Sequence, residues 1–175
     1  MTSLVSLRKL ETEDALCISE LANNKKIACN LRDRFPNPYT LNDAINFLEI
    51  MKDEQKLINF AICYKGDFVG IIGLIPQDDI YRFSAEMGYW VGETFWNKGI
   101  ASDAVSQIIE YAKNSSPLIR IYASAFDYNI ASQMVLMKNG FDFDCIAIKA
   151  VYKEGRIIDE YRYSYIFEEK IISNM

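Results

Sequence analysis

A glycine-containing turn between a strand and a helix is the part of this chain best suited to hold a ligand. An apolar run at 85–92 leads into the turn at 93–99, and a helical run follows at 103–112. Gly99 and the small Ala101 let a ligand approach the backbone closely. The helix start adds unpaired N–H groups and a positive dipole end. The pattern predicts a site for phosphate or pyrophosphate, unless it is only an ordinary connection.

Three further polar residues could act beside such a site. Glu86 interrupts the apolar strand, which costs free energy unless the carboxylate is paired or functional. It is therefore either a working carboxylate or an edge residue paired with Arg82 or a lysine. Asn129 and Ser132 follow downstream as Asn-x-x-Ser, ahead of Gly140-Phe141. The Asn129 amide can both accept and donate hydrogen bonds at a helix start, or it can simply cap the helix.

Several classes of chemistry are excluded by composition. The chain has no histidine, which removes Ser-His and Cys-His nucleophiles and most zinc sites, so we expect no metal. The four cysteines are scattered without a Cys-x-x-Cys pair and predict reduced core residues of a cytoplasmic protein. A net charge of -5 argues against nucleic-acid binding. We expect no membrane association or secretion signal, while a homodimer is compatible with the sequence.

The order of elements predicts how these residues are positioned. Strands are expected at 4–10, 60–64, 68–75, 81–91, 118–123, 141–152 and 156–167. Helices are expected at 11–23, from Thr40 through an apolar stripe to Met51, from Ile100 to about Asn114, and at 128–139. A hairpin followed by alternating helices and strands implies an α/β (α+β) domain with a mixed sheet and helices on both faces.

The turn and the Asn-x-x-Ser segment together resemble the cofactor-binding core of the GCN5-related N-acetyltransferases (GNAT), which move an acetyl group from acetyl-coenzyme A to an amine. The closer resemblance is to the RimJ/RimL-like ribosomal-protein N-terminal acetyltransferases, because 31–33 and 35–40 look like that subgroup's early loop and second helix start. The resemblance extends from Leu7 to about Phe167. It implies one acetyltransferase domain over 1–175, with about seven strands, mostly antiparallel, and a central parallel pair that splays apart.

Acetyl-coenzyme A is the co-substrate that the resemblance implies, with no metal. It would lie along a bulged strand end, the turn and the two following helices. The implied contacts are Tyr89, Trp90, Val91, Asn97, Lys98, Gly99, Ile100, Ala101, Ser102, Asn129 and Ser132. Trp96 stands where the family usually has Gln or Arg. Because backbone N–H groups make most of the phosphate contacts in that turn, we expect binding to persist.

The implied reaction is a direct attack of the amine on the thioester in a ternary complex. Glu86 lies where several relatives place a general base. Leu136 replaces a tyrosine that many relatives use as general acid. Ser132 is then the expected proton donor to the thiolate, because the RimL-like relatives that this chain resembles have serine there, or else it is only a hydrogen-bond partner of the helix backbone or pantetheine.

The acceptor is expected to be a primary amine, first of all a protein or peptide N-terminus. By resemblance, Arg32, Phe35 and Tyr39 lie near its entrance, or they form only a packed and solvated loop. A polyamine or an aminoglycoside is the alternative acceptor. The departures at Trp96 and Leu136 leave open a module that binds acyl-coenzyme A without catalysis.

Overall fold

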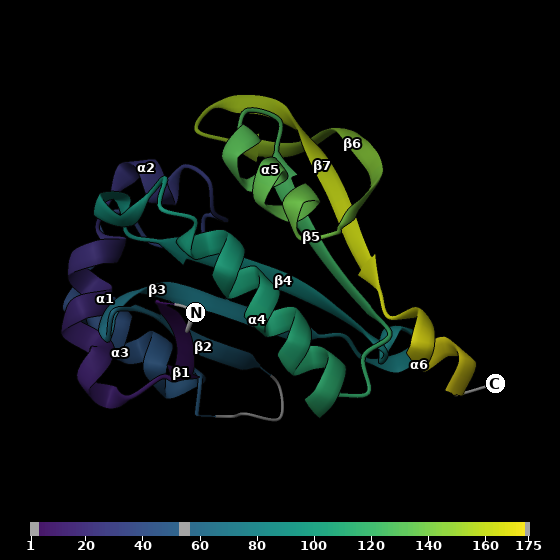
Figure 1. Cartoon of the computed structure of the whole chain (residues 1–175). Helices are drawn as coiled ribbons and strands as arrows, with labels where there is room; N and C mark the ends of the chain where they lie inside the picture. The colour runs from purple at the N-terminus through teal and green to yellow at the C-terminus, as the bar shows by residue number, and fades with distance from the viewer. Residues whose placement is uncertain (1–3, 53–56, 174–175) are drawn as a thin grey trace.

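A seven-stranded mixed sheet forms the centre of the molecule (Figure 1). The computed structural model describes residues 4–52 and 57–173. In chain order the strands are β1 (Val5–Lys9), β2 (Ile58–Tyr64), β3 (Asp67–Pro76), β4 (Ser84–Val91), β5 (Arg120–Phe126), β6 (Asp142–Lys153) and β7 (Arg156–Ile166). Their order across the sheet is β1-β2-β3-β4-β5-β7-β6. The predicted fold class is confirmed.

The central pair, β4 and β5, is parallel and parts early. Pairing runs only from Ser84 with Arg120 to Glu86 with Tyr122, although β4 continues to Val91 and β5 to Phe126. In Figure 1 the two strands lie together near α6 (Glu168–Ser173) and diverge toward α2 (Lys25–Ala28). The predicted splay is therefore present, and the main chain beyond Glu86 lacks a neighbouring strand on that side in the described chain.

Helices cover both faces of the sheet because its strands alternate apolar residues to either side. On one face, α4 (Ile100–Ser115) and α5 (Ile130–Lys138) pack against a core that includes Met87, Ile121 and Tyr163. On the other, α1 (Ala15–Ala22) and α3 (Leu41–Ile50) pack against a second core with Ala61 and Ile71. Short 3₁₀ helices lie at η1 (Thr12–Asp14), η2 (Asp79–Tyr81) and η3 (Glu93–Phe95).

An ion pair fixes the first strand to the first helix. Arg8 donates to both oxygens of the nearly buried Asp14, at 2.6 and 2.8 Å. Burial acts to raise the pKa of Asp14, but hydrogen bonds from Arg8 and from the Glu11 N–H overcome it, so the pKa lies below its usual value. The ionised carboxylate therefore contributes to stability at neutral pH.

Local signals in the sequence predicted several boundaries correctly. Thr40 and Asp43 form the reciprocal capping box at the start of α3, and Gly140 ends α5 with a φ of 80°. The predicted helix 11–23 is instead a 3₁₀ turn followed by a shorter helix. The predicted strand 81–91 begins at Ser84, because the polar 78–81 segment forms η2. Helix α6 was not predicted.

The prediction of core cysteines was wrong for two of the four. Cys63 is buried, but Cys17 and Cys145 are exposed, because each lies on the solvent side of its element. All four are free thiols.

Candidate active site

The end of β4 turns backbone groups into the gap that its separation from β5 creates. The Gly92 N–H donates to the Val69 carbonyl at 2.8 Å, so the β4 residues at even positions pair with β3. Tyr89 and Val91 therefore direct their N–H and C=O groups toward β5, past the last β4–β5 pair. The register between β3 and β4 is unbroken from Ala85 to Val91 in the described ladder. The predicted bulge was wrong, and separation of the strands is what exposes these groups.

A hydroxyl pair links β4 to α5 across this gap. Tyr89 points to the face covered by α4 and α5, and its hydroxyl lies 2.9 Å from the Ser132 hydroxyl. Burial raises the pKa of Tyr89 to about 12, despite the opposing hydrogen bond from Ser132. The phenol is therefore protonated at neutral pH, and the two hydroxyls can pass a proton between them.

Glu86 points to the opposite face of the sheet, three residues before Tyr89 on the same strand. It forms an ion pair with Arg32 from the loop after α2, and both side chains line a cavity of about 410 Å³. The alternative partners considered for Glu86, Arg82 or a lysine, are not the ones used. The structure thus joins two predicted site residues that are 54 positions apart.

The turn before α4 provides a concave run of backbone N–H groups. Asn97 and Gly99 have φ values of 61° and 77°, and α4 starts without a side-chain cap. A Cβ at Gly99 would meet nothing within 4 Å, so the space above the turn is open. The first intrahelical bond comes from Asp103 to the Gly99 carbonyl, which leaves the N–H groups of residues 100–102 facing outward along the helix axis. This geometry suits a pyrophosphate.

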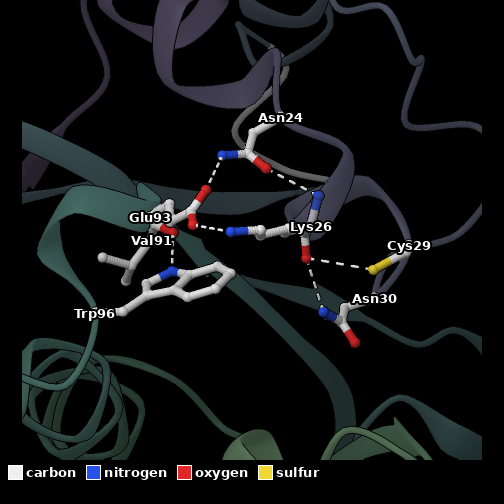
Figure 2. Close-up of polar contacts among 7 residues, drawn as sticks. All are labelled: Asn24, Lys26, Cys29, Asn30, Val91, Glu93 and Trp96. Atoms are coloured by element: carbon white, nitrogen blue, oxygen red, sulfur yellow. Dashed lines mark hydrogen bonds and ion pairs between the residues drawn. The ribbon is translucent and has the colours of Figure 1, made fainter.

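Side chains stabilise the turn from both sides (Figure 2). The Trp96 indole N–H donates to the Val91 carbonyl at 2.6 Å, which holds the turn against the end of β4. Glu93 forms an ion pair with Lys26 and accepts from Asn24 at 2.7 Å. These hydrogen bonds from Lys26 and Asn24 lower the pKa of Glu93. Trp96 therefore has a structural role in place of the expected Gln or Arg.

The predicted residues of the turn and the next helix differ in what they present. Lys98 donates to the Thr94 carbonyl at 3.0 Å and lies over the Phe95 ring, so its ammonium is held at η3. The Ile100 side chain is buried in the core, Ala101 packs beside it, and the Ser102 hydroxyl accepts from Asn139 at 3.0 Å. Residues 100–102 can therefore contact a ligand through their backbone N–H groups and not through their side chains.

The start of α5 lies beside the hydroxyl pair. The Asn129 oxygen accepts from the Ser132 N–H at 3.2 Å, which is the capping role considered from sequence. Leu136 is completely buried in the core, so a side chain at this position of this chain does not face the gap. The Tyr128 hydroxyl donates to the Cys29 carbonyl at 2.5 Å and so joins α5 to the segment after α2.

Three predicted residues lie in the second core. The Trp90 main chain pairs with Ile71 of β3, and its ring packs beside Phe35 and Phe68. Phe35 also contacts Tyr39, with ring centroids 4.9 Å apart, and Tyr39 is only 6% exposed. Trp90 is partly buried and Tyr39 is buried, and neither side chain lines the Glu86 cavity. Of the expected acceptor residues, Arg32 is the one that lines the cavity.

Eight of the ten residues that line the cavity were not predicted from the sequence. Arg120 and Tyr122 of β5 and Glu160 and Arg162 of β7 line the same cavity as Glu86. The signal was available in 156–167, where the tyrosines at 161, 163 and 165 form one face and polar residues alternate with them.

The part of the chain that the structure describes has neither a side-chain cluster suited to a metal ion nor a helix suited to cross a membrane. No group of three or more His, Cys, Asp or Glu side chains there is placed to hold a metal ion. None of the helices described is long and apolar enough to cross a membrane.

Comparison with known proteins agrees with this geometry. An N-acetyltransferase of Bacillus licheniformis, p20, is 28% identical over 173 residues, which cover 96% of each chain. The L-amino acid N-acetyltransferase AaaT of Escherichia coli is 26% identical, covering 91% of this chain and 96% of its own. The structure of RimL, a ribosomal L7/L12 α-N-protein acetyltransferase in complex with coenzyme A, superposes with a TM-score of 0.85 at 19% identity, covering 94% and 95%.

The family assignment rests on the match that spans the gap and both helices beside it. The acetyltransferase (GNAT) domain family model matches residues 5–142, which include the parted strands, the turn and the hydroxyl pair. Since this is well over half of the chain, the protein is a member of the GNAT acetyltransferase family.

Proposed function

We propose that this N-acetyltransferase works by direct attack of a primary amine on acetyl-coenzyme A, with Glu86 as general base and Ser132 as proton donor. The observation that carries the proposal is their placement on opposite faces of the sheet, at the gap between β4 and β5. An amine arriving from the Glu86 face would meet a thioester held in the gap, while the thiolate would leave toward Ser132.

The turn and the strand end are the proposed binding site for acetyl-coenzyme A. The backbone of Asn97 to Ser102 would hold the pyrophosphate, because its N–H groups converge and the space above Gly99 is open. The pantetheine arm would pair with the Tyr89 C=O and with one of the N–H groups of Tyr89 and Val91, since Trp96 occupies the Val91 carbonyl. The Asn129 amide nitrogen would donate to a pantetheine carbonyl.

Each step of the transfer has a residue in reach of the gap. Glu86 would take the proton of the acceptor ammonium, directly or through water, once Arg32 releases it. The nitrogen then bonds to the acetyl carbon and gives up its second proton to solvent as the carbon–sulfur bond breaks. A backbone N–H at Tyr89 or Val91 would stabilise the carbonyl oxygen by roughly a few kcal/mol. Ser132 would protonate the thiolate and take a proton back from Tyr89, which would regain its own proton from solvent.

The natural acceptor is proposed as a primary amine that reaches the Glu86 cavity. An α-amino group, of a peptide or of a free amino acid, is favoured because AaaT and RimL, which are similar to this chain, are named for such acceptors. A polyamine or aminoglycoside remains the competing acceptor, since either offers an amine that Glu86 could deprotonate.

The test combines binding and turnover. Isothermal titration should detect acetyl-coenzyme A binding, and thiol release should exceed background with at least one member of an amine panel of alanyl and seryl peptides, amino acids, polyamines and aminoglycosides. Failure of the well-folded protein to bind acetyl-coenzyme A overturns the proposal. Binding without thiol release above background would instead favour the non-catalytic module.

A further inference from the structure

The cavity at Glu86 lies on a face of the sheet that carries a concentration of charge. Alternation along the strands sends Arg120 and Tyr122 of β5, and Glu160 and Arg162 of β7, to the same face as Glu86. The helices α1 and α3 cover this face over β2, β3 and the far end of β4, around Trp90. The cavity lies on the same face, over the start of β4 and over β5 and β7.

Three guanidinium groups and two carboxylates line this cavity, and a third carboxylate, that of Asp144, pairs with Arg120 at 2.7 Å. Positive and negative side chains at the cavity therefore balance, although the whole chain is acidic. Arg120, Arg32 and Arg162 all act to lower the pKa of Tyr122, against burial and Glu86, which raise it overall. All three arginines line the one cavity, so a ligand there can meet more than one of them. The Arg162 contact with Glu160 is long, at 3.5 Å, and leaves most of its N–H donors available.

The ion pair between Arg32 and Glu86 occupies the place that a substrate must take. If Glu86 accepts the proton of the amine, the ammonium must displace Arg32, whose side chain is 58% exposed and sits on a loop. A polyamine would satisfy Glu86 but would leave Arg32 without its partner, beside two other guanidinium groups. An amine that also carries a carboxylate would satisfy both residues at once, with its ammonium on Glu86 and its carboxylate on Arg32.

We propose that the acceptor is a zwitterion, a primary amine with a carboxylate close to it, which replaces the Arg32–Glu86 ion pair within the cavity. This inference rests on the proposed function and narrows its substrate class. The carboxylate can come from a free α-amino acid or from an acidic side chain next to a peptide N-terminus. Arg162 contributes a second guanidinium to the same carboxylate.

Acceptor pairs in which one member has a carboxylate and the other an amide in its place test the inference. Thiol release is measured for the L-amino acids against their C-terminal amides, for Ala-Asp amide against Ala-Asn amide, and for spermidine. We expect kcat/KM to be about 10- to 100-fold higher for the carboxylate member of one pair, as for a charge-assisted hydrogen bond. The first pair identifies an α-carboxylate and the second an acidic side chain.

The variant Arg32→Gln should remove this preference, lowering the ratio of kcat/KM for the carboxylate acceptor to kcat/KM for its amide about 10-fold or more. Arg34→Gln, on the same loop but outside the cavity lining, is the matched control and should keep it. The inference is overturned if an amide is preferred over its carboxylate partner, if spermidine is preferred over the carboxylate acceptors, or if the carboxylate preference survives Arg32→Gln. None of these results overturns the proposed acetyl transfer. No acetylation of any amine overturns the proposed function as well.

Discussion

Replacing Tyr89 by phenylalanine would remove a single hydroxyl from the hydrogen bond that joins β4 to α5. This hydroxyl lies 2.9 Å from Ser132 Oγ, and its longer contact, at 3.4 Å, is with the Ser132 carbonyl. If the pair works as proposed, Tyr89 orients the serine and restores its proton after each turnover. The variant keeps the ring, which packs beside the larger core, and so isolates the hydroxyl.

The expected magnitudes follow from what is lost. A neutral hydrogen bond is worth about 1 kcal/mol, so Tyr89→Phe should lower the melting temperature by about 2–4 °C in a domain of this size. Loss of a proton donor typically costs about 100-fold or more, which sets the expectation for Ser132→Ala. A misoriented serine should cost about tenfold in kcat, or about 1.4 kcal/mol.

A double-mutant cycle distinguishes a shared role from two separate ones. Initial rates of thiol release at saturating acetyl-coenzyme A give kcat for the wild type, the two single variants and the double variant. Because Tyr89 acts through Ser132, the double variant should be no slower than Ser132→Ala alone. If the losses of kcat in the two single variants multiply in the double variant, Tyr89 and Ser132 act separately and the proposed pair is refuted. An effect of Tyr89→Phe on KM alone would refute it as well.

Three further predictions use other parts of the structure. Gly99→Ala should weaken acetyl-coenzyme A binding at least about tenfold, as measured by calorimetry. Gly66 also has a positive φ and open space around it, so Gly66→Ala should cost the same backbone strain of about 1–2 kcal/mol without affecting binding. Glu86→Gln should lower kcat more at pH 7 than at pH 9.5, where the amine deprotonates unaided; an equal loss at both would remove Glu86 as base. The lowered pKa of Asp14 contributes stability above its unfolded value of 3.8, which is lost as the pH falls through the folded pKa. Asp14→Asn should therefore lower the melting temperature by about 4–8 °C at pH 7, and the difference should vanish in acid; a constant difference would exclude the Arg8 pair as its cause.

Local chemistry explains which parts of the fold were predictable. The capping box at Thr40, the left-handed stop at Gly140 and the alternating strands each depend on a few neighbouring residues, so their signals survive without tertiary context. The shortened β4 and the split first helix were missed, because adjacent polar segments made 3₁₀ turns that compete closely with regular structure.

Distant contacts explain what was missed in the site. The predicted bulge proved to be a separation of strands, which depends on how β4 and β5 twist apart rather than on any local residue. The packing of Trp90 and Tyr39 against the second core depends on α1 and α3, which cover that part of the sheet. The polar residues on β5 and β7 have no local sequence signal that predicts their contact with the Glu86 cavity.

The sequence by itself determined the family, the order of elements and the backbone turn around Gly99, because these are written in short-range patterns and in residues whose conformational freedom is local. Only the tertiary structure decided which side chains meet. It placed the Tyr89 hydroxyl on Ser132 and Arg32 on Glu86, on opposite faces of one strand. Both contacts bring together residues far apart in the chain. The packing that offsets the conformational entropy lost in ordering them is spread over the whole sheet.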